Sequence, residues 1–185
     1  MVGRRVVRFS LRTGRGVSAW GEIGAALAAE FALPDAGVLT VMLVRVLTAA
    51  VLGGLIGYER ERKGRAAGLK THILVSMGSA LFVLAPLLAG IGADDVTRVM
   101  QGIVSGVGFL GAGAILKIDR GERVEGLTTA AGVWMTAAIG MAAGMGQEIV
   151  ALVTTVVALL VVGAIPRVLP ARSPDPDSDH PARGG

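Results

Sequence analysis

The sequence predicts an all-α, polytopic membrane protein with about five transmembrane helices. Its mean hydropathy is +0.65, and 52% of its 185 residues are hydrophobic whereas only 17% are charged. A helix needs about twenty mainly apolar residues to cross the hydrocarbon core of a bilayer. Five apolar runs approach this length, at residues 38–57, 73–91, 99–116, 127–146 and 149–165. A soluble domain would return to polar residues every few positions, so we expect these runs to contact the lipid bilayer.

The two ends of the chain differ from this central domain, which spans residues 38–169. Residues 1–37 form a basic N-terminal tail, with five arginines among the first fifteen residues. The Ala-rich stretch within it, interrupted by Glu22 and Glu30, predicts either a helix at the membrane interface or an extension without fixed structure. Residues 170–185 are polar and proline-rich, which is typical of a disordered tail.

Charge in the connectors between the runs predicts their orientation. Lysine and arginine are enriched in cytoplasmic loops, and the connector over residues 59–72 contains five of them. The connector after the third run contains three, whereas the second has only Arg98 beside Asp94 and Asp95. The odd connectors and the C-terminus are therefore expected in the cytoplasm, and the N-terminus outside. Because the basic residues flank the membrane, they indicate lipid contact rather than nucleic-acid binding, despite a pI of about 10.3.

Glycines at four-residue spacing predict close helix packing. In lipid, helices gain little from burying apolar surface, so small residues that let backbones approach become important. Gly53 and Gly57 share a face of the first helix, and Gly102 and Gly106 share a face of the third. The fourth helix has a longer series, formed by Gly132, Thr136, Gly140 and Gly144. The G-x-G-x-x-G pattern at residues 106–111 follows no strand, so it does not indicate dinucleotide binding.

No residues suited to catalysis come together in the sequence. The chain has no cysteine and only two histidines, His72 at a membrane edge and His180 in the C-terminal tail. Neither a nucleophile–base pair nor a typical zinc-ligand spacing is present. We therefore expect no enzyme activity and no cofactor, leave a metal site open, and interpret His72 as an interfacial side chain.

Several charges lie within or beside the runs. Arg45 is inside the first run, where a guanidinium must face other helices, pair, or extend to the interface. It belongs either to an anion or proton pathway or to a span that starts later than residue 38. Glu59 shares a helix face with Arg62 and Lys63 and is expected to pair with one of them. Asp94 and Asp95 are expected to cap the third helix, with attraction of cations as the alternative.

Three segments, residues 45–72, 98–117 and 124–140, together resemble the MgtC/SapB family of bacterial inner-membrane proteins. The resemblance implies a five-helix membrane unit linked to survival at low magnesium and, in pathogens, to growth inside host cells. It also implies regulators that bind other membrane proteins, such as the proton-translocating ATP synthase. A homo-oligomer is a separate expectation, because interfaces between subunits could form a pathway that one chain does not show. The family signature falls on Arg45, Gly57, Glu59, Arg60, Glu61, Gly68, Lys70, Thr71, Arg98, Gly106, Gly108, Gly111, Gly113, Gly126, Thr128, Thr129 and Trp134.

The match has departures. Lys70 stands where arginine is more usual, which keeps the charge but loses the planar guanidinium. The soluble C-terminal domain of the virulence-type members is not expected after residue 170, and the N-terminal extension has no counterpart in the family. We expect Glu59, Arg60, Glu61, Lys70 and Thr71 to form one polar cluster where the bilayer meets the cytoplasm, either as an anchor or as a functional surface.

Two functions compete. One is a non-catalytic regulator of other membrane proteins, and the other is a transporter or channel for magnesium or another cation. Magnesium prefers oxygen ligands in octahedral geometry and loses its water reluctantly. Because the five apolar runs contain no acidic residue, the sequence favours the regulator.

Overall fold

The computed structural model describes residues 19–117 and 124–168, and the chain divides into two compact units, Met1–Ala36 and Gly37–Gly185. The first unit contains helix α1, Ala19–Glu30, whose residues are all exposed. Of the two alternatives for this stretch, the structure has the helix and not the extension without fixed structure, and the place of the helix at a membrane interface stays a prediction. The expected C-terminal tail lies outside the described residues.

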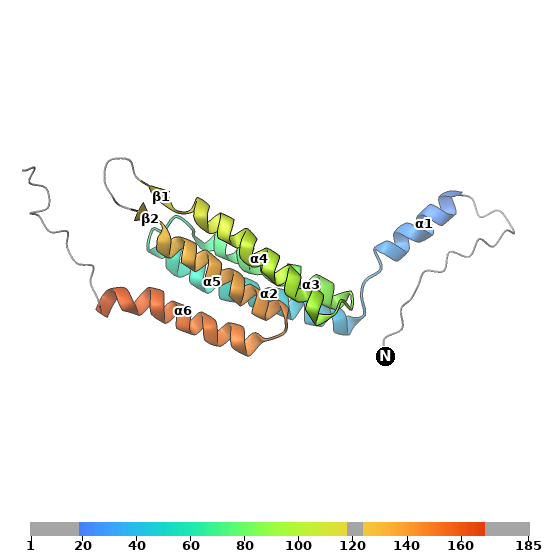
Figure 1. Cartoon of the computed structure of the whole chain (residues 1–185). Coiled ribbons are helices and arrows are strands. Elements are labelled where there is room, and N and C mark those ends of the chain that lie inside the picture. Colours follow the sequence, from blue (N-terminus) through green and yellow to red (C-terminus); the bar gives the residue numbers. More distant parts are fainter. Residues whose placement is uncertain (1–18, 118–123, 169–185) are drawn as a thin grey trace, which may run out of the picture. The chain divides into compact units, whose positions relative to one another are not determined.

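The second unit is a bundle of long helices that lie side by side along their lengths (Figure 1). These are α2 (Ala36–Arg62), α3 (Leu69–Leu88), α4 (Ala93–Gly113), α5 (Leu127–Gly144) and α6 (Glu148–Val168). By length and composition, α2, α3 and α5 can cross a membrane, and α6 has a shorter apolar stretch, Glu148–Gly163. The prediction of a helical membrane protein is confirmed, while the number of crossings stays a prediction.

The helix boundaries differ from those of the apolar runs. Helix α2 continues five residues beyond residue 57, which places Glu59 and Arg60 on the helix. Helix α4 begins at Ala93, after the N-cap residue Gly92, and the structure shows no side-chain cap hydrogen bond there. The N-cap position is therefore occupied by Gly92 and not by an aspartate, whereas the expected place of Asp94 and Asp95 at the start of the helix is confirmed. They lie in its first turn, where negative charge still favours the helix dipole.

A short β-ribbon joins α4 to α5. Strand β1 (Leu116–Lys117) pairs antiparallel with β2 (Val124–Glu125), with Leu116 opposite Glu125. The prediction that the third run stays helical to residue 116 is wrong, because the helix ends at Gly113. Strands of two residues are too short to show the alternation that identifies a strand in sequence.

Glycines set the packing of α3 against α2 and α5. A Cβ atom at Gly53 would lie 2.6 Å from Cβ of Ser76, and one at Gly57 would lie 2.8 Å from Cα of Leu69. On α5, a Cβ at Gly140 would collide with the carbonyl oxygen of Ser76. The predicted close packing of the first and fourth runs is confirmed, because only glycine allows these backbones to approach so closely.

The same prediction is wrong for α4 within this chain. A Cβ atom at Gly102 or Gly106 would meet no atom within 4 Å in residues 19–117 and 124–168. Both glycines instead line an apolar groove of about 510 Å³ between α3 and α4. Their four-residue spacing was therefore a misleading indicator of a helix crossing inside the bundle.

Candidate functional site at the charged end of the bundle

The last turns of α2 carry a charged group that links two helices. The Nε atom of Arg60 donates to Oε2 of Glu59 at 2.7 Å, and Nζ of Lys63 pairs with Oε1 of the same carboxylate. Arg60 is only 2% exposed, so its guanidinium is held inside the protein by a charge partner. The expected pairing of Glu59 is confirmed with Lys63, whereas Arg62 is exposed.

Both cations of this group also bind the backbone of α6. Nζ of Lys63 donates to the carbonyl oxygen of Val162 at 2.6 Å, and Nη2 of Arg60 donates to it at 3.4 Å. The helical partner of that carbonyl would be the amide four residues later, which belongs to Pro166 and carries no hydrogen. The charged group therefore satisfies an acceptor that α6 cannot satisfy itself.

Glu61 performs a different task at the start of α3. Its Oε2 atom accepts a hydrogen bond from the backbone N–H of Leu69 at 2.7 Å. The N-cap residue is Gly68, which has no side chain to supply such an acceptor, and a Cβ atom there would lie 2.7 Å from the same Oε2. A carboxylate at this end meets free N–H groups and the positive end of the dipole. Glu61 and Gly68 therefore act together to fix the α2–α3 turn.

The expected cluster of five polar residues is only partly formed. Glu59, Arg60 and Glu61 hold helix ends, as described above. The side chains of Lys70 and Thr71 are exposed and form no hydrogen bond or ion pair with other residues in the described ranges. Lys63, which is absent from the family signature, takes a place in the cluster that the sequence analysis had given to Lys70.

Arg45 on α2 contacts the C-terminal end of α5. Its Nη1 atom donates to the carbonyl oxygen of Gly144 at 3.1 Å, where α5 ends. Gly146, with φ of +78°, leaves room for the guanidinium, because a Cβ atom there would collide with it. Arg45 thus faces another helix and caps its C-terminus, as a cation does favourably. Of the three alternatives for Arg45, the structure shows contact with a neighbouring helix, and its part in an anion or proton pathway stays a prediction.

His72 is buried rather than interfacial. It is 0% exposed, and its Nδ1 atom lies 2.9 Å from the carbonyl oxygen of Gly68. Two glycines make room for the ring, since a Cβ at Gly57 would lie 2.9 Å from its Cβ and one at Gly132 would lie 3.6 Å from its Nε2. The interpretation of His72 as an edge side chain was wrong because these glycines on neighbouring helices are invisible in its local sequence.

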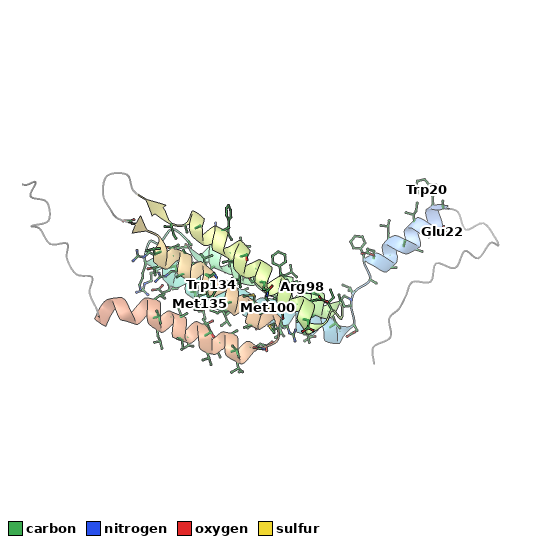
Figure 2. The ribbon with its side chains drawn as sticks, in the orientation of Figure 1. Trp20, Glu22, Arg98, Met100, Trp134 and Met135 are labelled. Carbon is green, nitrogen blue, oxygen red and sulfur yellow. The ribbon has the colours of Figure 1, made fainter. Side chains whose placement is uncertain are left out.

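The remaining signature residues gather around α4 and α5 without forming one site. Gly126 has φ of +93° and lies against the Ala114 carbonyl, Thr129 is buried, and Thr128 is exposed. Trp134 on α5 and Arg98 on α4 are labelled in Figure 2. Trp134 is 46% exposed, and Arg98 forms an exposed ion pair with Asp95 at 3.6 Å. A Cβ at Gly111 would lie 3.5 Å from Cβ of Ala130, whereas a Cβ at Gly106, Gly108 or Gly113 would meet no atom of the described residues within 4 Å.

The acidic and histidine side chains are dispersed. In the ranges that the structure describes, no three His, Asp or Glu residues come close enough together to hold a metal ion. The charged side chains at this end of the bundle form hydrogen bonds with backbone groups of α3 and α6. The sequence analysis did not identify the Val162 carbonyl as the partner of these charges. Its one indication in the sequence is Pro166, which lacks the N–H that would bond this carbonyl.

The chain is similar to a group of bacterial proteins. Residues 46–169 match the MgtC family. YhiD of Escherichia coli strain K12, named as a putative magnesium transporter, is 43% identical over 127 residues, which cover 64% of this chain and 58% of YhiD. SrpB of Synechococcus elongatus is 44% identical over 135 residues, which cover 67% of this chain and 74% of SrpB.

MgtC of Salmonella typhimurium strain LT2 is 44% identical over 117 residues, which cover 63% of this chain and 49% of MgtC. The chain thus spans little more than half of YhiD and about half of MgtC. No solved structure matches it. Since the matched family segment extends from the middle of α2 to the end of α6 and includes the charged end of the bundle, the chain belongs to the MgtC family.

Proposed function

We propose that this protein is a non-catalytic regulator in the bacterial inner membrane, which supports growth at low magnesium through helix contacts with other membrane proteins. The link to magnesium comes from the name of YhiD and from the family resemblance. The proton-translocating ATP synthase is a candidate partner through that resemblance, and a homo-oligomer is a second kind of assembly.

The observation that carries this proposal is how the bundle uses its charges. Glu59, Arg60 and Lys63 join α2 to the backbone of α6, and Glu61 joins α2 to the start of α3. These side chains fix the relative positions of α2, α3 and α6 at one end of the bundle. A surface of fixed helix ends suits recognition of another membrane protein better than it suits a passage for hydrated ions.

Cation transport is the second candidate, and the description of YhiD favours it. A dehydrated magnesium ion would need about six oxygen ligands in octahedral geometry. Among the described residues such a site has no cluster of acidic side chains to draw on. A transport pathway would therefore depend on backbone and hydroxyl oxygens, or on interfaces between subunits.

The substitution Glu59→Gln tests the role of the charged end. The amide oxygen can still accept from Arg60, while the amide NH2 replaces the oxygen that faces Lys63. The side chain keeps its size, so we expect the variant to reach the membrane but to lose growth support at low magnesium. Growth of a deletion strain that expresses the variant is compared with its membrane content by immunoblot. Arg62→Gln, an exposed change in the same turn, is the control and should complement normally.

Normal growth with Glu59→Gln would contradict a functional role for this carboxylate. A variant that is absent from the membrane would assign Glu59 to folding instead, and the exposed Lys70 would then be the position to test with the same growth assay.

The proposed multi-pass topology places the α2–α3 turn in the cytoplasm and the α3–α4 turn outside, because lysine and arginine concentrate in the former. Single cysteines at Ala66 and Gly92 are treated with a membrane-impermeant thiol reagent on intact cells. We expect labelling at Gly92→Cys and none at Ala66→Cys until the cells are opened. The reverse pattern would overturn the orientation.

A further inference from the structure

The start of α5 has features of an anion site that the proposed function does not use. Helix α5 begins after Gly126, and the structure shows no side-chain hydrogen bond capping its first turn. The first N–H groups of a helix lack partners within the helix, and together with the helix dipole they attract anions. A polar pocket of about 560 Å³ opens at this point, between the α2–α3 turn and the β-ribbon.

The side chains around this pocket point to the same kind of ligand. Thr129 is 4% exposed and lines the pocket, yet its hydroxyl has no hydrogen-bond partner among the described residues. Arg65 lines the pocket from the α2–α3 turn, and it forms no ion pair within those ranges. Glu125 is the acidic side chain on the rim, and it is exposed. A guanidinium, hydroxyls and helix amides are the groups that bind a phosphate oxygen.

An apolar groove continues from this pocket along α5. It has a volume of about 360 Å³ and separates α5 from α6. Thr128 lines both the polar pocket and this groove, and the groove then follows Ala131 and Met135 on the same face of α5. Its α6 wall includes Val157 and Val161. The polar and apolar parts therefore meet at one residue, at the end of a helix suited to crossing a membrane.

We propose that this combined site binds an anionic phospholipid. The phosphate is held by the first turn of α5, Arg65 and the hydroxyl of Thr129, and one acyl chain lies in the groove between α5 and α6. Charge complementarity at the pocket selects the anionic headgroup, and the apolar groove beyond Thr128 selects a lipid over a soluble phosphate. The proposal requires α5 to cross the bilayer, and it does not depend on the regulatory function.

Lipid titration of the full chain tests this assignment. The protein is purified in a neutral detergent, and short-chain phosphatidylglycerol is added while the thermal unfolding midpoint is followed. Phosphatidylcholine of the same chain length and glycerol phosphate serve as the other two ligands. We expect phosphatidylglycerol to raise the midpoint most, because a ligand that binds only the folded state stabilises it.

Variants separate the two halves of the site. Arg65→Gln should weaken apparent phosphatidylglycerol affinity about fivefold, the effect of one basic residue near an anionic lipid. Thr129→Val should weaken it similarly, and Ala131→Phe should do so by filling the groove. Arg62→Gln lies in the same basic segment outside the pocket and should leave the affinity unchanged.

Three results would overturn the proposal. Equal stabilisation by phosphatidylcholine would remove the recognition of an anion, and equal stabilisation by glycerol phosphate would reassign the pocket to a soluble phosphate compound. Equal loss of affinity in Arg65→Gln and Arg62→Gln would show that general positive charge, rather than this pocket, attracts the lipid.

Discussion

Replacing Gly126 with alanine should remove most of the folded protein from the membrane. The residue has φ of +93°, a conformation that costs other residues about 1–2 kcal/mol. Its new Cβ would also collide with the carbonyl oxygen of Ala114 and lie 3.1 Å from Cα of Ile115. These are backbone atoms that cannot move aside as a flexible side chain does, so an overpacking cost of about 1–3 kcal/mol adds to the strain.

Two matched glycines control for each contribution in the Gly126→Ala experiment. Gly64 has φ of +64° but open space around it, so Gly64→Ala should show only the strain. Gly108 has neither a positive φ nor a close neighbour, so Gly108→Ala should be neutral. Membrane abundance and detergent unfolding temperature should fall in the order Gly108→Ala, Gly64→Ala, Gly126→Ala. Equal stability of Gly126→Ala and Gly108→Ala would contradict the observed contact.

The substitution Gly140→Leu should prevent assembly of the bundle, whereas Gly106→Leu should be tolerated. Any side chain at Gly140 meets the backbone of α3 at Ser76, and separating these helices gains no compensating hydrophobic energy in lipid. A Cβ atom at Gly106 would meet no neighbouring helix within 4 Å in the part of the chain that the structure describes, and Gly106 borders the groove between α3 and α4, which can accept a side chain. The measurement is the fraction of each variant that elutes as a monodisperse species in detergent. Similar loss in both variants would place Gly106 at a helix contact outside the single chain.

Hydropathy was sufficient to predict the helices, because apolar runs of this length have few alternatives in a membrane protein. It was less informative about their ends. Helix α2 continues through Arg62 because charged residues continue a helix well once it leaves the apolar region. The β-ribbon between α4 and α5 was not predictable from strands of two residues.

Glycine spacing showed which helix faces consist of small residues, but it did not show what those faces contact. The glycine faces of α5 and α2 pack against α3, at Gly140 and Gly53 respectively. The glycine face of α4 at Gly106 instead borders an open groove. The identity of a neighbouring helix depends on contacts distant in sequence, and a single chain's spacing pattern does not contain them.

The candidate site was predictable only where its contacts are local. Glu59 and Lys63 are four residues apart on one helix, so their pairing followed from helix geometry. Their link to Val162 joins residues 99 positions apart, and it depends on a proline that removes one backbone donor. His72 was misplaced for the same reason, since the glycines that bury it belong to other helices.

The central proposal, that the protein regulates other membrane proteins and does not itself carry magnesium, is tested most directly by flux measurements. The full chain is reconstituted in sealed liposomes that contain a magnesium-sensitive dye, and magnesium is added outside with and without a membrane potential. The protein version used for the liposomes must also restore growth of a deletion strain at low magnesium. We expect entry of magnesium no faster than in liposomes without protein. Saturable entry that is lost in Glu59→Gln liposomes would contradict the regulatory account and establish transport.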